Sequence, residues 1–123
     1  MCPQINSDDV ELIISDNNSP DDTENIVKDF ILTNKRIQYF KQETNVGAAR
    51  NFLSLMHRAK GEYLFLLGDD DILTDNAVSI LVDRLKGSYY GLLYIETRPC
   101  DNKDYTVYNV VHSFIKEISY FYT

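Results

Sequence analysis

Cysteines are scarce in this chain, and long apolar runs and a surplus of positive charge are missing. Cys2 and Cys100, with no paired spacing, are too few for a disulfide scaffold or a zinc site. No apolar run approaches the roughly 20 residues that a membrane-spanning helix needs, and no secretory leader opens the chain. We therefore expect a protein of the cytoplasm, where thiols stay reduced.

Acidic residues outnumber basic ones, 19 to 12, and the formal net charge is -7. Nucleic acid would call for a basic face, so we expect no nucleic-acid partner. An anionic nucleotide is not excluded, because a metal cation can bridge its phosphates to carboxylates. With 123 residues, of which 44% are hydrophobic, the chain allows one domain with a modest core.

Short apolar segments alternate with amphipathic ones, which predicts an α/β fold with a mostly parallel sheet and flanking helices. We expect strands at residues 10–15, 36–41, 62–68 and 90–97, and helices beginning near Pro20, Gly47 and Asp75, with stops near Gly61 and Gly87 for the last two. The first helix would open on a Ser19–Asp22 capping box. Core positions are predicted at Ile26, Val27, Phe30 and Ile31 on the first helix, Ala49, Phe52, Leu53 and Met56 on the second, and Val78, Leu81, Val82 and Leu85 on the third.

Both ends of the chain differ from those of a complete doubly wound domain. Residues 1–9 are short and polar, where such a domain has its first buried strand. Residues 105–123 are rich in aromatic and β-branched residues with nothing predicted to cover them, which favours association into an oligomer. We therefore expect a partial domain over residues 1–123.

Three consecutive carboxylates, Asp69, Asp70 and Asp71, follow the apolar run at 62–68. Unit charges about 4 Å apart repel by roughly 4 kcal/mol at an effective dielectric of 20, so the cluster calls for solvent, cations or a metal. Ligands of open α/β sheets bind beyond the carboxyl ends of strands, where this cluster falls. A divalent-metal site is the leading hypothesis. The alternative is ordinary turn and cap chemistry, with Asp71 or Asp75 opening the next helix.

A second polar loop, Asp16-Asn17-Asn18-Ser19, also follows a predicted strand, and Asn45 to Asn51 opens a predicted helix. With Gly68 to Asp71, these segments resemble three motifs of family 2 glycosyltransferases of the GT-A fold, over roughly residues 8 to 97. Asp16 to Ser19 is similar to the family's Asp-Asp-Gly-Ser loop. The second segment is compressed relative to the family pattern, and Leu67 stands where the family often has an aspartate.

The resemblance implies sugar transfer from a nucleotide-diphospho-sugar donor to a saccharide or lipid-linked acceptor, in polysaccharide biosynthesis, with the parent enzyme at the inner face of the membrane. It implies Mn²⁺ or Mg²⁺ as the metal. The residues implied for donor binding are Asp16, Asn18, Asn45, Arg50, Asp69 and Asp70, and those for the metal are Asp70 and Asp71. Asp70 takes the so-called DxD position.

The residue types suit this chemistry independently of the family. Negative charge grows on the diphosphate as the glycosidic bond breaks, and a divalent cation held by carboxylates stabilises it. The acceptor also needs a general base, and we expect this base and the acceptor pocket beyond Thr123.

Other interpretations remain open. The chain is alternatively a non-catalytic nucleotide-binding or assembly module derived from such an enzyme. A structural ion pair is an equally good interpretation of Arg50. Asn45 and Gly47 are alternatively turn and cap residues. His57 and His112 lack partners at ligand spacing and receive no role. A signalling receiver with Asp16 as its phosphorylated residue is disfavoured, because such a domain has an acidic pair after a strand upstream of that residue, and Asp8 and Asp9 follow no predicted strand.

Overall fold

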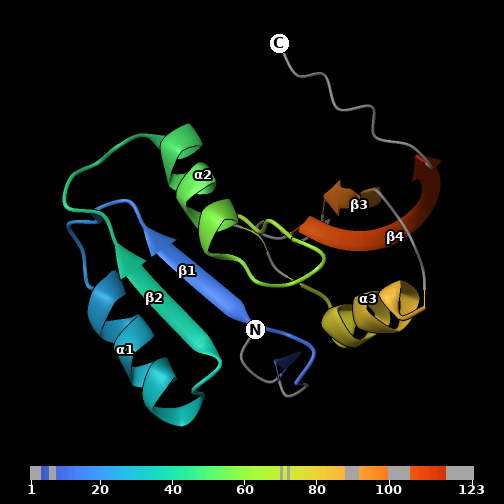
Figure 1. Ribbon diagram of the computed structural model, residues 1–123, viewed down its shortest axis with the longest axis horizontal. Helices are drawn as coiled ribbons and strands as arrows, with labels where there is room; N and C mark the ends of the chain where they lie inside the picture. Colours follow the sequence, from blue (N-terminus) through green and yellow to red (C-terminus); the bar gives the residue numbers. More distant parts are fainter. Residues whose placement is uncertain are drawn as a thin grey trace. The chain divides into compact units, whose positions relative to one another are not determined.

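The computed structural model in Figure 1 contains two compact units, residues 2–66 and residues 67–123. The structure describes residues 4–5, 8–69, 71, 73–87, 92–99 and 106–115, and the last two ranges are described by their backbone. Each unit is taken by itself below. The expected single domain over residues 1–123 stays a prediction.

The first unit is a small α/β layer. Its elements follow the order β1 (Leu12–Asp16), α1 (Thr23–Thr33), β2 (Ile37–Lys41) and α2 (Ala48–Arg58). The two strands are parallel and in register from the pair Leu12 and Ile37 to the pair Asp16 and Lys41. The expected α/β class is confirmed, with α1 as the crossover that parallel strands require.

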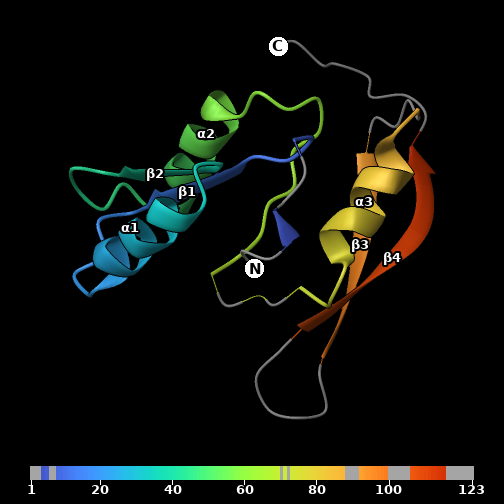
Figure 2. The same ribbon diagram turned by 90° about the horizontal axis from the view of Figure 1, so that it is seen from below.

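The two helices lie on opposite faces of the β1–β2 pair. Successive side chains of a strand point to opposite faces. Ser15 is hydrogen-bonded to Asn51 of α2, whereas Lys41, at the end of β2, reaches Glu24 of α1. Figure 2 shows the same arrangement, with the strands running between the two helices.

Glu11 joins the beginning and the end of this unit. Its Oε1 accepts hydrogen bonds from the backbone N–H groups of Lys60, at 2.7 Å, and Gly61, at 3.2 Å. Its Oε2 accepts one from the Gln38 side chain, at 3.0 Å. One carboxylate thus fixes the segment after α2 against the start of β1.

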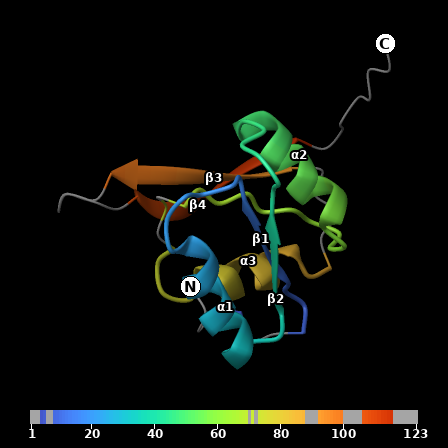
Figure 3. The same ribbon diagram turned by 90° about the vertical axis from the view of Figure 1, so that its left-hand side faces the viewer.

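The second unit contains α3 (Ala77–Leu85), β3 (Leu92–Pro99) and β4 (Thr106–Ile115). The two strands form an antiparallel pair with a register shift between Leu93 and Ile95. Figure 3 shows β3 and β4 next to each other. The strand predicted at 90–97 is therefore present as Leu92–Pro99, and its pairing with β4 is the antiparallel part of a fold expected to be mostly parallel. None of the helices in the described part of the chain is long and apolar enough to cross a membrane.

The strand expected at residues 62–68 does not form. This segment has no regular secondary structure, and Leu64, Phe65 and Leu66 are each at least 40% exposed. An apolar run becomes a strand only when a neighbouring backbone pairs with it, and no strand pairs with this one within the described residues. The acidic residues therefore follow an irregular segment.

Two helix boundaries differ from the expected ones. Helix α1 begins at Thr23 instead of Pro20, because Asp21 Oδ1 accepts hydrogen bonds from the Thr23 N–H and hydroxyl in a local turn. Helix α2 ends at Arg58, before the predicted stop at Gly61. Helix α3 begins at Ala77, and Gly87, at φ 71°, follows its end as expected.

The core of the described residues is small. It consists of Ile5, Val27 and Ile37 in the first unit and Ala77 and Leu81 in the second.

Most of the predicted core positions are not buried, and several were wrong. Those that are exposed are Ile26 and Phe30 on α1 and Ala49, Phe52, Leu53 and Met56 on α2. A pair of strands is only about 5 Å from backbone to backbone, whereas the apolar stripe of an amphipathic helix spans 100° or more of its surface. Two strands therefore cannot cover the stripe of either helix.

The difference in burial between two residues of α1 can be tested by alanine substitution. Val27 is 8% exposed and Leu32 is 82% exposed. Val27→Ala should lower the free energy of unfolding by about 1.5 kcal/mol, because two buried methyl groups are lost. Leu32→Ala, the control, should change it by less than about 0.5 kcal/mol. Urea unfolding followed by circular dichroism measures both, and equal losses would contradict this description of the core.

Candidate functional site

The carboxyl ends of β1 and β2 lie at the same edge of their sheet because the strands are parallel. Beyond Asp16 and Lys41 the pairing continues for one more bond, from the Gln42 N–H to the Asp16 carbonyl, at 2.8 Å. Two polar loops, residues 17–22 and 42–47, begin at this edge. In open α/β sheets this is where ligands bind.

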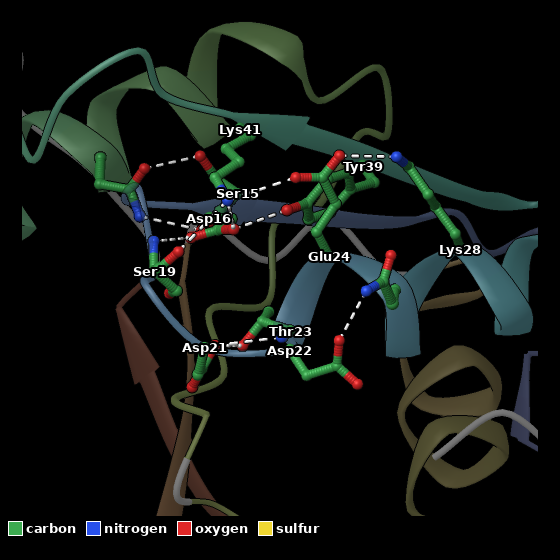
Figure 4. A network of polar contacts seen from close by, with 12 residues as sticks. Ser15, Asp16, Ser19, Asp21, Asp22, Thr23, Glu24, Lys28, Tyr39 and Lys41 are labelled. Carbon is green, nitrogen blue, oxygen red and sulfur yellow. Dashed lines mark hydrogen bonds and ion pairs between the residues drawn. The ribbon is translucent and has the colours of Figure 1, made fainter.

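Asp16 is the centre of a polar network at this edge, shown in Figure 4. Its Oδ1 accepts the Ser19 backbone N–H at 2.6 Å, and its Oδ2 accepts the Tyr39 hydroxyl at 2.6 Å. The Lys41 ammonium lies 3.7 Å from Oδ2. The side chain is 0% exposed. Direct contact between this carboxylate and a ligand therefore requires a change in the neighbouring loop.

The network keeps Asp16 ionised. Burial alone would raise the pKa of Asp16, but the hydrogen bonds from Tyr39 and Ser19 and the charge of Lys41 together lower it below its ordinary value. For Tyr39, burial and the hydrogen bond to Asp16 both raise the pKa far above its ordinary value. The phenol therefore stays protonated and serves as a donor.

Lys41 extends the network to α1. Its ammonium donates to the Ser19 carbonyl at 3.2 Å and to Glu24 at 3.3 Å. Glu24 also accepts a hydrogen bond from Lys28, at 2.6 Å, and these contacts lower the pKa of Glu24. A carboxylate at the end of β1 is thus connected to the first turns of α1 through one lysine.

The two loops are joined by asparagine side chains. Asn17 Nδ2 donates to Asn45 Oδ1 at 2.9 Å, and Asn17 Oδ1 accepts the Val46 N–H at 2.9 Å. Asn18, the next residue, is exposed and has a left-handed backbone, with φ 66°. The predicted donor-binding residues Asn18 and Asn45 are therefore brought to one edge of the sheet.

Arg50 lies in the first turn of α2 and is exposed. The helix begins after Gly47, whose φ of 84° favours glycine, and is held to β1 by Asn51. Asn51 Nδ2 donates to the Ser15 carbonyl at 3.0 Å, and the Ser15 hydroxyl donates to Asn51 Oδ1 at 2.6 Å. The guanidinium is thus free to meet an anion at the start of a well-anchored helix.

The acidic cluster belongs to the second unit. Asp71 Oδ2 accepts the Gly68 N–H at 2.9 Å, and the Asp71 N–H donates to the Gly68 carbonyl at 3.3 Å, so the segment is a tight turn. Asp69 is exposed and Asp71 is half-buried, while Asp70 lies outside the described residues. The described residues alone contain no group of three acidic, histidine or cysteine side chains placed to hold a metal ion.

Sequence reasoning missed Tyr39, Lys41 and Asn17. A signal was present for the first two: the alternation at residues 36–41 places Tyr39 and Lys41 on one face of a strand. The pairing of Lys41 with Asp16 depends on the register, which the structure shows. Nothing in the sequence pointed to Asn17 except its position between the predicted donor ligands Asp16 and Asn18.

The chain is similar to several curated bacterial glycosyltransferases. It is 33% identical over 102 residues to a GalNAc(5)-diNAcBac-PP-undecaprenol beta-1,3-glucosyltransferase of Campylobacter jejuni, covering 80% of this chain and 33% of the relative. It is 38% identical over 74 residues to the abequosyltransferase RfbV of Salmonella typhimurium, covering 59% of this chain and 22% of the relative. It is 29% identical over 90 residues to the glycosyltransferase GlyG of Streptococcus pneumoniae, covering 67% of this chain and 30% of the relative.

The chain spans about a third or less of the length of these relatives. No solved structure is significantly similar to it. The family model described as glycosyl transferase family 2 matches residues 2–122, which is nearly the whole chain. The α/β fold, with two parallel strands that end in polar loops, agrees with that match. The chain therefore belongs to glycosyl transferase family 2.

Proposed function

We propose that this chain supplies the donor-binding part of a glycosyltransferase that uses a nucleotide-diphospho-sugar. The observation that carries the proposal is the pair of polar loops joined at the carboxyl ends of β1 and β2. Family membership and the names of the relatives support the same class of reaction.

Within the first unit, the proposed donor ligands are Asp16, Asn18, Asn45 and Arg50. Arg50 and the first turn of α2 offer positive charge and free N–H groups to the diphosphate. Asn18 and Asn45, both exposed, offer amide groups to the nucleoside. Asp16 holds the first loop through Ser19, and a shift of residues 17–19 would give the nucleoside access to the carboxylate.

In the second unit, Asp69 and Asp70 are the proposed donor ligands, and Asp70 and Asp71 are the proposed ligands of Mn²⁺ or Mg²⁺. Carboxylate oxygens are the donors that such hard cations prefer. When bound, the cation would stabilise negative charge on the leaving diphosphate. One oxygen of Asp71 already accepts a hydrogen bond from the Gly68 N–H, so Asp71 would offer its other oxygen to the cation.

The acceptor is proposed by analogy. The name of the Campylobacter relative includes a glycan linked to undecaprenol through a diphosphate. We propose a saccharide or lipid-linked acceptor in polysaccharide biosynthesis.

Calorimetric titration tests the donor site. UDP, GDP, CDP and dTDP are each titrated into the protein with and without Mn²⁺. One nucleotide should bind, and more tightly with Mn²⁺. Asp70→Asn should remove the gain due to the metal, about tenfold or more in affinity, because a ligand charge is lost. Asp83→Asn, an exposed carboxylate on α3, is the control and should bind as the unchanged protein does.

The outcomes are distinct. Binding that does not depend on Mn²⁺ or on Asp70 would reject the metal site and leave the nucleotide site standing. If no nucleotide binds to a folded sample, the donor-site proposal fails and the alternative of a non-catalytic assembly module is favoured.

The donor-site proposal needs Asp16 in its ionised form. Because the hydrogen bond from Tyr39 lowers the pKa of Asp16, we expect Tyr39 to extend the stability of the folded protein to lower pH. The folded pKa of Asp16 is lowered, so the stability it contributes is present above its unfolded pKa, about 3.9, and is lost as the pH falls through the folded value. Tyr39→Phe removes one of the hydrogen bonds that lower this pKa. It should cost about 1.5–3 kcal/mol at pH 7 and move acid unfolding to higher pH.

Acid titration followed by circular dichroism measures this shift. The control is Asp16→Asn, with and without Tyr39→Phe. In that background, the phenylalanine should no longer change the acid midpoint, because the titrating carboxyl is gone. A shift of equal size in both backgrounds would show that Tyr39 does not act through Asp16.

A further inference from the structure

The two loops of the candidate site are joined by two hydrogen bonds, which together with a third bond inside the second loop form what we call the amide latch. It consists of Asn17 Nδ2 to Asn45 Oδ1, at 2.9 Å, the Val46 N–H to Asn17 Oδ1, at 2.9 Å, and the Gly47 N–H to Asn45 Oδ1, at 3.0 Å. Both polar atoms of the Asn17 side chain point to the second loop. The amide nitrogen and the amide oxygen of Asn17 are thus both engaged between the loops.

The latch is not needed to hold the fold together. The strands are already paired through Asp16, whose carbonyl accepts the Gln42 N–H, and α2 is already fixed to β1 by the bonds between Asn51 and Ser15. Two of the three latch bonds are exposed to water, where a hydrogen bond adds little to stability. The latch therefore affects the conformation of the two loops more than the stability of the fold.

The latch sets where α2 begins. Asn45 Oδ1 accepts the N–H of Gly47, whose φ of 84° turns the chain into the helix. The Gly47 carbonyl in turn accepts the Asn51 N–H, which closes the first helical turn around Arg50. From Asn17 to the turn that carries Arg50 there is a continuous path of hydrogen bonds.

We infer that Asn17 is a positioning residue for the donor site: through Asn45 and Val46 it holds the Arg50 turn and the Asn18 loop in the arrangement that binds the nucleotide diphosphate. The inference rests on the proposed function. Fixing both loops before the ligand arrives lowers the entropy cost of binding, which is how preorganised contacts raise affinity.

Asn17→Ala tests the inference. The variant should bind the nucleotide identified by calorimetry about tenfold more weakly, because an unlinked loop must be ordered on binding. Its midpoint of urea unfolding should stay close to that of the unchanged protein. Asn25→Ala is the control: Asn25, in the first turn of α1, is an exposed asparagine whose side chain donates to Asp22 Oδ1 at 2.6 Å and, among the described residues, has no hydrogen bond to the second loop. It should change neither quantity.

Hydrogen exchange of the Val46 amide gives a readout independent of the nucleotide. In the free protein this amide is protected by Asn17 Oδ1 and should exchange more rapidly in Asn17→Ala, while the Gln42 amide, bonded to the Asp16 carbonyl, should keep its protection.

Failure of the positioning role of Asn17 and failure of the proposed function give different results. If the unchanged protein binds a nucleotide and Asn17→Ala binds it equally well, the positioning role is overturned and the donor site stands. If affinity and unfolding midpoint fall together, Asn17 is a structural residue and the inference is also overturned. If the unchanged protein binds no nucleotide, the proposed function fails, and the inference fails with it.

Discussion

Parallel pairing of β1 with β2 is the constraint on which the rest of the first unit depends. Parallel neighbours end at the same edge, so the register that pairs Asp16 with Lys41 also places two polar loops beside each other. The pairing leaves a carboxylate out of water at that edge, and a buried charge is stable only when donors surround it. Tyr39, Ser19 and Lys41 supply those donors from the strand and loop that the register brings near.

Local sequence patterns predicted much of this unit. Helices α1 and α2 and both strands follow from apolar periodicity, and the polar loops follow from residues 16–19 and 45–51. The start of α1 was missed because Asp21 bonds to Thr23 and forms a turn where a capping box was expected. The loops were correctly expected to carry polar ligands, but their mutual contacts depend on side-chain directions that periodicity does not give.

The predictions that failed concern contacts distant in sequence. Leu64 to Leu66 have the composition of a buried strand, yet a strand needs a partner, and composition does not say whether one is available. Strand β3 was predicted, and its antiparallel pairing with β4 depends on a segment for which no strand had been assigned. The exposed side chains of α1 and α2 were predicted to be buried because an apolar stripe indicates which face a helix would bury and not whether a surface exists to bury it.

The carboxylate of Glu11 has a consequence for how the first unit forms. It binds backbone groups 49 and 50 residues further along the chain. Closing so long a loop costs chain entropy that nearby contacts do not, and contacts of large sequence separation slow folding. The bonds from Lys60 and Gly61 cost the least chain entropy when β1, α1, β2 and α2 have already brought the two ends of the unit together. The protection of those two amides from exchange would therefore report contact between the beginning and the end of the unit.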